Sequence, residues 1–364
     1  MDKYLLALTL IPEIGPITLK KCLDLIGSPE EIWQTDFQTW KNLGFSERLS
    51  EILSQAKNEF NPDKLLNEFL ESGITTTCYN EDSYPANLKN LDSSPLILYY
   101  RGNLDILNNR KILAVVGSRK ISTYGQQIIP SLLEPLKNLK ITIASGLAFG
   151  VDRLAHEWAV QLKLPTVGVL GSGLAWTSFY PKENKKLAEQ ILASGGLIVS
   201  EMPADYQAMP FDFPRRNRLI AGLCDVCLVI EAAQKSGALI TARMSAEQNK
   251  EVLAVPQNIN LPNAKGVNSL LQAGAVPVLT SEDIAYALGF GEVNRQNNPL
   301  IESLIKNLSP EEKLIYDLLS LEELSLDDLI ERSDNQINNL FGVLLNLEIK
   351  GLIKNNGEQR YLKI

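Results

Sequence analysis

The segment ILAVVGSRKISTYG (112–125) joins a buried strand, a glycine turn and the start of a helix, and this unit sets the fold class. Further apolar runs of strand length follow it, each separated from the next by a stretch of helical pattern. They are ITIASG (141–146), TVGVLG (166–171), GLIVSE (196–201), VCLVIEA (226–232) and EVLAVP (251–256). Parallel strands require crossover helices, which cover both faces of the sheet. We therefore predict an α/β fold with a Rossmann-like, doubly wound, mainly parallel sheet.

The segment before this core has a different pattern. The first 72 residues are helical, and LTLIPEIGPITLKKCLDLIG (8–27) resembles a SAM-like or helix-hairpin-helix module. In such a hairpin the backbone around Gly15, supported by Lys20 and Lys21, can hold a DNA phosphate. The acidic balance of this region favours instead a small packing or interaction module.

Turn residues dominate the lead-in from 79 to 103, where one apolar run predicts an edge strand or a strap across the core. After the core, the polar stretch 291–304 has the composition of a linker. Beyond it, a capping box at Ser309 and Glu312, two further helical stretches and a terminal hairpin predict a winged helix. The predicted domains are residues 1–72, 73–290 and 305–364, with the linker at 291–304.

Composition argues against several classes of protein. The chain has 364 residues, 45% of them hydrophobic and 21% charged, and no apolar run long enough to span a bilayer. We therefore expect a cytoplasmic globular protein of more than one domain. Four cysteines without a second CxxC motif predict buried thiols rather than a zinc site or a disulfide framework. His156 is the only histidine, and no metal or cofactor is expected.

Charge is distributed unevenly along the chain. The net charge is −8 overall, with −5 over residues 1–75, +1 over residues 76–304 and −4 over residues 305–364. A polyanion is attracted to the least acidic region, so such a ligand is expected to meet the central part of the chain.

The loops after the predicted strands are rich in glycine and cations, and ligands of doubly wound sheets bind at this carboxyl edge. GSRKISTYG (117–125) offers a tight turn, helix amides and a guanidinium. FPRRNR (213–218) adds three arginines beside an aromatic ring, and KSGALITA (235–242) adds a lysine before a helix start. The candidate ligand contacts are Gly117, Ser118, Arg119, Ser145, Gly146, Lys182, Asn184, Phe213, Arg215, Arg216, Asn217, Arg218, Lys235, Ser236, Gly237 and Thr241.

Two of these patterns also have structural interpretations. Asp152 and His156 lie on one helical face and could form an acid–base pair, although a helix cap and a structural hydrogen bond are favoured. Among the three clustered arginines, we expect at least one to pair with Asp212, Asp225 or Glu231.

The number of these loops indicates the size of the ligand. No loop matches GxGxxG and the chain has no GxxxxGK[ST] motif, so neither a dinucleotide cofactor nor a P-loop ATPase is expected. Phe179 and Tyr180 beside Lys182 suit stacked bases and phosphates. Several helix starts and cations along one sheet edge exceed what a mononucleotide needs, and they predict binding of single-stranded nucleic acid.

The motifs VVGSRKISTYG, SGLAFGVDRLAH, GVLGSGLAWTSFYPKEN, FPRRNRLIAGL and VIEAAQKSGALITA, in this order, resemble the DNA-processing protein A (DprA, or Smf) family. The resemblance covers residues 80 to 280 or so and implies a non-enzymatic function. Family members bind single-stranded DNA cooperatively, form dimers through the core and load the recombinase RecA during natural transformation. The resemblance also implies that Arg119, Lys182 and the FPRRNR cluster contact DNA.

The chain departs from the family pattern in two loops. Gln257 and Val267 stand where relatives usually have glycine and threonine, which leaves the backbone path of the last core loop open. Ala175 and Trp176 stand where relatives often have an acidic residue after the glycines of GSGLAWTSFYP. We interpret this second departure as a reshaped pocket rim.

Two alternatives remain open. Lonely Guy and lysine-decarboxylase-like enzymes share a similar core and cleave nucleoside monophosphates. KSGALITA has no glutamate three residues beyond Thr241, however, and Glu247 lies too far along the helix. The acidic terminal modules could also dock a protein partner, because NQINNLFGVLLNLEIKG (335–351) carries Lys350 as its single cation.

Overall fold

The computed structural model describes residues 2–11, 13–89, 91, 93–108, 110–291, 305–319, 324–333, 339–355 and 360–363. The chain divides into two compact units, Met1–Gly291 and Glu292–Ile364. The predicted linker 291–304 lies outside the described residues, apart from Gly291.

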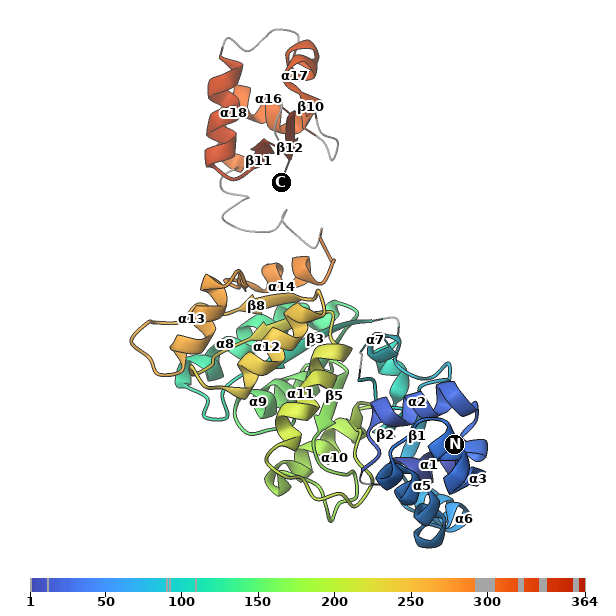
Figure 1. Cartoon of the computed structure of the whole chain (residues 1–364). Coiled ribbons are helices and arrows are strands. Elements are labelled where there is room, and N and C mark those ends of the chain that lie inside the picture. The colour runs from blue at the N-terminus through green and yellow to red at the C-terminus, as the bar shows by residue number, and fades with distance from the viewer. Residues whose placement is uncertain are drawn as a thin grey trace. The chain divides into compact units, whose positions relative to one another are not determined.

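The described part of the first unit contains a nine-stranded sheet (Figure 1). Its strands, in spatial order, are β1 (Thr75–Cys78), β2 (Ile97–Gly102), β6 (Leu197–Ser200), β5 (Thr166–Leu170), β4 (Ile141–Ser145), β3 (Lys111–Val116), β7 (Val226–Val229), β8 (Glu251–Ala254) and β9 (Val276–Pro277). The pairs β1–β2 and β2–β6 are antiparallel, and all other neighbours are parallel. The predicted doubly wound, mainly parallel sheet is confirmed.

The strand order reverses at β3, which has β4 on one side and β7 on the other. Alternate residues of β3 face opposite layers, as a pleated strand requires. Leu113 and Val115 share a core with α8 (Thr123–Leu133) and α9 (Val151–Gln161). Ala114 and Val116 share a core with α11 (Asp212–Leu223) and α12 (Gly237–Glu247). The other helical elements of this region are α7 (Ala86–Lys89), η1 (Leu104–Leu107), η2 (Glu134–Asn138), η3 (Lys182–Asn184), α10 (Lys185–Ala193), α13 (Ala264–Gln272) and α14 (Ser281–Ala287).

The lead-in region differs from its prediction. The apolar run became β2, which lies second in the sheet and pairs on both sides, rather than at the edge. The edge strand is β1, from the sequence TTTC, which had no apolar run to reveal it. Threonine is β-branched and polar, so it suits a strand that has one open side.

Among the described residues before the sheet there are six helices: α1 (Lys3–Thr9), α2 (Pro16–Ile26), α3 (Pro29–Gln34), α4 (Phe37–Asn42), α5 (Glu47–Glu59) and α6 (Pro62–Glu71). Their buried side chains, among them Leu6 and Trp40, belong to the same core as Ile97 and Tyr99 of β2. The helices therefore pack directly on the antiparallel end of the sheet. Gly15, at the turn of the predicted hairpin, is exposed.

Arg101 of β2 fastens this helical region to the sheet. Its Nη1 donates to the carbonyl of Gly73 at 3.1 Å and its Nη2 to that of Ser72 at 2.9 Å. Its Nε donates to the carbonyl of Leu174 at 3.1 Å, and its guanidinium lies 5.4 Å from the centre of the Trp176 ring. One side chain thus joins the end of α6 to the loop after β5.

Replacing Arg101 by methionine should lower the free energy of unfolding by about 2 kcal/mol, because three carbonyls lose a charged donor. Urea unfolding of the full chain measures this effect. Arg48→Met in α5 is the matched control, since Arg48 is exposed and its loss should cost less than about 0.5 kcal/mol. Equal stability of the two variants would contradict the assigned role of Arg101.

The second unit contains α16 (Pro310–Leu318), β10 (Leu324–Ser325), α17 (Leu326–Arg332), α18 (Leu340–Ile349), β11 (Ile353–Asn355) and β12 (Arg360–Lys363). Its strands form an antiparallel sheet in the order β10–β12–β11. The predicted capping box at Ser309 and Glu312 is present, and the predicted hairpin turn falls on residues outside the described part. Helices followed by a small hairpin sheet are the arrangement of a winged helix.

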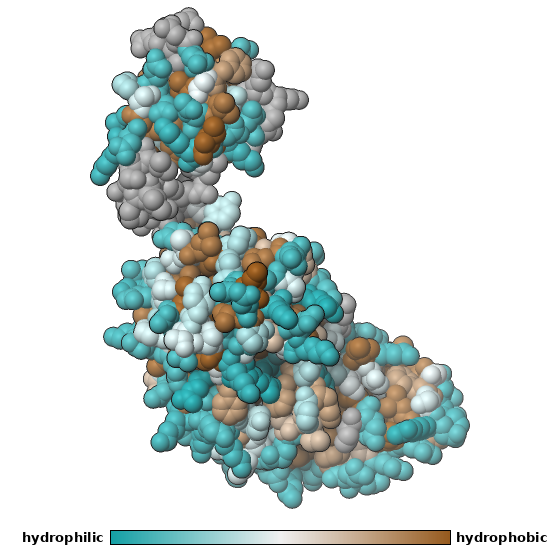
Figure 2. Space-filling model, turned by 90° about the vertical axis from the view of Figure 1, so that its left-hand side faces the viewer, coloured by the Kyte–Doolittle hydropathy of each residue, from teal (hydrophilic) through white to brown (hydrophobic). Residues whose placement is uncertain are grey.

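Helix α18 is poorly suited to reading a DNA groove. Its exposed large hydrophobic side chains are Phe341, Leu345 and Ile349, and Figure 2 shows brown, hydrophobic side chains on the surface of this unit. Lys350, just beyond the helix, donates to Glu312 at 2.7 Å. Across the described residues of the whole chain, no helix is both long and apolar enough to cross a membrane.

Candidate nucleic-acid interface

A pocket of about 640 Å³ lies where the strand order reverses, beyond the carboxyl ends of β3 and β7. Ligands of doubly wound folds bind at this position. We call it the switch-point pocket. Predicted contacts that line it are Gly117, Ser118, Arg119, Phe213, Arg216, Asn217, Lys235, Ser236, Gly237 and Thr241. Segments about 120 residues apart in the sequence therefore meet in one site.

The loop after β3 forms one wall of the pocket, and internal hydrogen bonds hold it in place. The amide of Ser118 donates to the carbonyl of Glu231 at 2.9 Å, and its carbonyl accepts from the amide of Val151 at 3.1 Å. The buried carboxylate of Glu231 also accepts from Ser122 N at 2.9 Å and Ser122 Oγ at 2.6 Å. Gly150 has φ +75°, and a Cβ there would lie 2.7 Å from the carbonyl oxygen of Arg119. The loop is therefore rigid before any ligand arrives.

A tilted pair of aromatic rings, Phe213 and Tyr180, lies beside this wall. The guanidinium of Arg119 lies 5.2 Å from the centre of the Phe213 ring, and the Tyr180 ring lies 5.4 Å from that of Phe213. Tyr180 is exposed, whereas Phe179 is only 2% exposed and packs 5.6 Å from the Trp176 ring. The expectation that Phe179 stacks a base is therefore wrong, because its ring belongs to the core. Of the two rings predicted to stack bases, Tyr180 is the one that lines the pocket.

The opposite wall is the start of α12. Ser236 is its N-cap and accepts from the amide of Ala238 at 3.3 Å, and Lys235 stands exposed just before it. The side-chain amide of Asn217 donates to the carbonyl of Gly237 at 3.2 Å, which couples α11 to α12. In the described part of the chain, no carboxylate oxygen lies within ion-pair distance of Lys235 or Arg119. Both cations are available to an anion.

The floor of the pocket contains two buried side chains of opposite charge, Arg216 and Asp152, which lie near one another without a direct ion pair. Arg216 is 4% exposed, and its Nη1 donates to the carbonyls of Val169 and, at 2.6 Å, Gly146. Burial lowers the pKa of Arg216 to about 10, although the nearby carboxylate of Asp152 acts in the opposite direction. Burial likewise raises the pKa of Asp152, which accepts from the amide of Gly146 at 3.1 Å. Gly146 permits this contact, since a Cβ there would lie 2.5 Å from Asp152 Oδ2.

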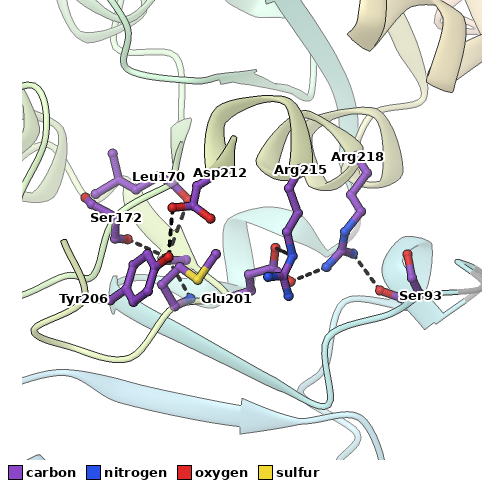
Figure 3. Close-up of polar contacts among 10 residues, drawn as sticks. Ser93, Leu170, Ser172, Glu201, Tyr206, Asp212, Arg215 and Arg218 are labelled. Carbon is purple, nitrogen blue, oxygen red and sulfur yellow. Dashed lines mark hydrogen bonds and ion pairs between the residues drawn. The ribbon is translucent and has the colours of Figure 1, made fainter. Parts of the chain in front are cut away.

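Arg215 and Arg218 lie outside the switch-point pocket. Both extend from α11 to Glu201, the carboxylate just after β6, as Figure 3 shows. Arg215 Nε is 3.4 Å from Glu201 Oε1, and Arg218 bonds Glu201 Oε2 and the carbonyl of Ser93. The Arg215 side chain is 45% exposed, and that of Arg218 is 13% exposed. Arg218 therefore has a structural role, which corrects its prediction as a ligand contact.

The expected partners of these arginines are engaged elsewhere. Asp212 accepts from the hydroxyl of Tyr206 at 3.0 Å, and Asp225 accepts from the amide of Ile112 at 2.7 Å. Glu231 holds the loop after β3, as described above. The prediction that at least one arginine is ion-paired is correct, but its partner is Glu201 rather than any of the three predicted carboxylates.

Four further predicted contacts are absent from the pocket lining, namely Ser145, Gly146, Lys182 and Asn184, although Gly146 lines a smaller adjoining hollow. Ser145 is fully buried and donates to the carbonyl of Val115 at 2.6 Å. Asn184 is fully buried and donates to the carbonyls of Leu147 at 2.7 Å and Ala148 at 3.2 Å. Both side chains position loops, so their prediction as direct contacts is corrected. Lys182 is exposed at the start of η3 and remains a candidate at the rim.

The possible acid–base pair does not form. His156 is fully buried, and its Nδ1 lies 2.7 Å from Thr166 Oγ1. Burial lowers the pKa of His156 to about 3, so the ring is neutral. The expected structural hydrogen bonds of Asp152 and His156 are present, but the expected helix cap is not, because Gly150 is the N-cap of α9 and no side chain caps it. The buried thiols are confirmed: burial raises the pKa of Cys22, Cys78 and Cys224 to about 11 and that of Cys227 still further.

Sequence reasoning missed several residues that line the pocket, namely Lys120, Pro210 and Asn263. Lys120 could have been found from its position beside Arg119. Asn263 comes from the last core loop, and its side-chain amide donates to the carbonyl of Lys120 at 2.9 Å. At the start of that loop, Gln257 Nε2 donates to the carbonyl of Ile230 at 3.0 Å, which ties the loop to the segment after β7.

Comparison with known proteins agrees with this geometry. The family model described as DNA recombination-mediator protein A matches residues 75–289, and the DprA winged helix domain matches residues 302–357, which confirms the predicted winged helix. Protein Smf of Synechocystis sp. is 30% identical over 391 residues, covering 98% of this chain and 98% of that protein. Protein Smf of Escherichia coli is 41% identical over 212 residues, covering 58% of this chain and 56% of that protein.

Two solved structures share the architecture. DNA processing protein A of Streptococcus pneumoniae aligns with a TM-score of 0.68 and 32% identity, over 79% of this chain and 98% of that one. The Helicobacter pylori protein, solved to explain its single-stranded DNA binding mode, aligns with a TM-score of 0.52 and 28% identity, over 65% of this chain and 97% of that one. The chain therefore belongs to the DNA-processing protein A family, whose members carry the names DprA and Smf.

Proposed function

We propose that this chain binds single-stranded DNA along the switch-point pocket and acts as a recombination mediator. The observation that carries the proposal is that Arg119 and Lys235, which have no acidic partner among the described residues, line one pocket with the half-buried ring of Phe213 and the exposed ring of Tyr180. Cations bind phosphates and aromatic rings stack bases, and this combination is typical of proteins that bind single strands.

The charges around the pocket favour a polyanion. Asp152 is the carboxylate among the described pocket-lining residues, and the buried Arg216 compensates it. Arg119, Lys120 and Lys235 then leave an excess of positive charge at the opening of a protein whose net charge is −8. Because the positive charge is concentrated at the pocket of an acidic chain, a polyanion is attracted to the pocket rather than to the protein as a whole.

The shape of the site favours a strand over a mononucleotide. A second, smaller hollow of about 60 Å³ adjoins the pocket and shares Arg119, Tyr180 and Phe213 with it. Gly171 and Pro181 extend its lining toward η3, where Lys182 is exposed. Because the smaller hollow shares both rings with the pocket, the rings can contact bases while Arg119 and Lys182 contact neighbouring phosphates of one strand.

The finer parts of the proposal rest on the family. The H. pylori relative binds single-stranded DNA, and we extend this property to the present chain. We further propose that the chain forms homodimers through its core and loads the recombinase RecA onto incoming strands during natural transformation in the cytoplasm. The exposed apolar side chains Val276 and Leu279, at the β9 edge of the sheet, support association between copies of the core.

A nucleotide hydrolase remains less well supported. Such an enzyme needs a carboxylate free to act on the glycosidic bond. Asp152 is buried against Arg216, and Glu247 lies exposed at the far end of α12. The described residues of the pocket therefore favour binding without chemistry.

Fluorescence anisotropy with labelled oligonucleotides tests the proposal. Single-stranded DNA should bind much more tightly than a duplex of equal length. The logarithm of its association constant should fall against the logarithm of salt concentration with a slope of about −0.7 for each phosphate contacted. Contacts to three or more phosphates would give a slope of about −2 or steeper. Equal affinity for single strand and duplex, or a slope near zero, would refute the proposal.

A further inference from the structure

An apolar ridge stands beside the switch-point pocket and takes no part in the core. It consists of Met209, Pro210 and Phe211, between the loop after β6 and the start of α11. Met209 is 50% exposed and Phe211 is 64% exposed, while Pro210 lines the pocket itself. A phenylalanine this exposed forgoes the free energy of burial unless a ligand covers it.

The buried side chain of Asp212 holds the ridge in place. Asp212 is fully buried, and its Oδ2 accepts from the amide of Met209 at 2.7 Å. The same oxygen accepts from the hydroxyl of Tyr206 at 3.0 Å, as Figure 3 shows. The amide of Asp212 in turn donates to the carbonyl of Met209 at 3.0 Å, and the carbonyl of Tyr206 accepts from the amide of Gly173 at 2.9 Å. Because the loop is already ordered, a ligand that contacts it loses little conformational entropy.

A cation accompanies the ridge. Arg215 follows Phe211 by one helical turn, and its amide donates to the carbonyl of Phe211 at 3.5 Å. Its side chain is 45% exposed, and a guanidinium has donors beyond the Nε that faces Glu201. The Arg218 guanidinium is less available to a ligand, because its Nη1 donates to the carbonyl of Ser93 and its Nη2 donates to Glu201. Phe211 and Arg215 therefore supply an exposed ring and a partly exposed cation one helical turn apart, outside the pocket, whereas Phe213 and Arg119 are in direct contact within it.

We propose that Phe211 is a second base-stacking position on the path of single-stranded DNA, with Arg215 contacting an adjacent phosphate and Asp212 acting as a positioning residue. The proposal rests on the proposed function, since it extends the same strand beyond the pocket. A nucleobase fits better than a protein partner because Pro210 makes the ridge continuous with the pocket. The exposed aromatic area is also limited to one ring.

Paired oligonucleotides test this role. Each variant is titrated with a thymidine oligonucleotide and with an abasic strand of the same length, and the ratio of the two affinities reports base stacking alone. Phe211→Ala should lower this ratio about tenfold, because one stacked base is worth about 1–3 kcal/mol, and should leave abasic binding unchanged. Phe211→Trp should keep the ratio, and Phe211→Leu should lower it. Phe341→Ala, which removes an equally exposed phenylalanine from the other unit, is the matched control.

The outcomes separate the two proposals. A wild-type protein that binds neither strand overturns the proposed function and this inference with it. A wild-type protein that prefers the thymidine strand, together with a Phe211→Ala variant that has the same ratio, overturns only the role of Phe211. A Phe211→Ala variant with an unchanged ratio but an altered sedimentation coefficient makes the ridge a protein contact, and this also overturns the inference.

Discussion

Replacing Arg119 and Lys235 together by alanine should weaken single-stranded DNA binding about a hundredfold at low salt, since each phosphate contact supplies roughly 1–2 kcal/mol. The two side chains stand on opposite walls of the switch-point pocket, and neither has an acidic partner within the described residues. Their loss should leave the fold intact. The salt slope should also become shallower by about 1.4, because two phosphates lose their cations.

The matched control removes the same charge elsewhere. Lys64 in α6 and Lys163 after α9 are exposed and lie outside the pocket lining. Lys64→Ala with Lys163→Ala should change the affinity less than threefold or so, since only the long-range field is altered. Anisotropy titrations across a salt series measure both doubles. If the two double variants lose affinity equally, the cations act by net charge and the pocket is not the binding site.

Replacing Arg216 by methionine should lower the free energy of unfolding by about 3–5 kcal/mol, which for a unit of this size lowers Tm by roughly 10 °C. The residue is 4% exposed, and its guanidinium binds the carbonyls of Gly146 and Val169. Its removal would leave these carbonyls without a donor and Asp152 without its cation. Differential scanning fluorimetry and urea unfolding measure the loss.

A second substitution identifies the cause of this loss. Asp152→Asn in the Arg216→Met background removes the buried carboxylate that the first change isolates, and it should recover about 1–2 kcal/mol. If the double variant is less stable than Arg216→Met alone, the pair is not electrostatically coupled. Arg216 therefore supports the site by stabilising the fold around it. Its loss cannot be used as a simple test of DNA contact, whereas Arg119 and Lys235 can.

The sheet was readily predictable because buried parallel strands leave an unambiguous signal. Each of the six predicted apolar runs became a strand of the sheet, and the glycine loops after β3 and β7 met at the switch point. The edge strand β1 was missed, since TTTC carries neither an apolar run nor a clear alternation. Its pairing with β2 depends on contacts between segments about 20 residues apart, which periodicity alone does not reveal.

The candidate site was predicted less completely, because motifs show residue types but not side-chain directions. Three arginines in FPRRNR appeared to form one cluster, yet helical spacing separates them. Arg215 and Arg218 are three residues apart and share a face toward Glu201, whereas Arg216 points about 100° away into the floor of the pocket. This division follows from the helical period and could have been drawn from the sequence. The identity of Glu201 as partner could not, since it lies in a separate loop.

The pairing of β3 with β7 also has a consequence for how such a site can evolve. Val116 and Val229 are partners in register, and Glu231, two residues further on, anchors the loop after β3. The bases of the two pocket walls are therefore set apart by one strand spacing, about 4.8 Å. Mutations and insertions can change the height and charge of the loops at the pocket rim. The spacing of the two walls at their base is fixed by the sheet. If the chain binds single-stranded DNA as proposed, backbone hydrogen bonds between β3 and β7 would preserve its selectivity for a thin, flexible chain even when the residues at the rim change.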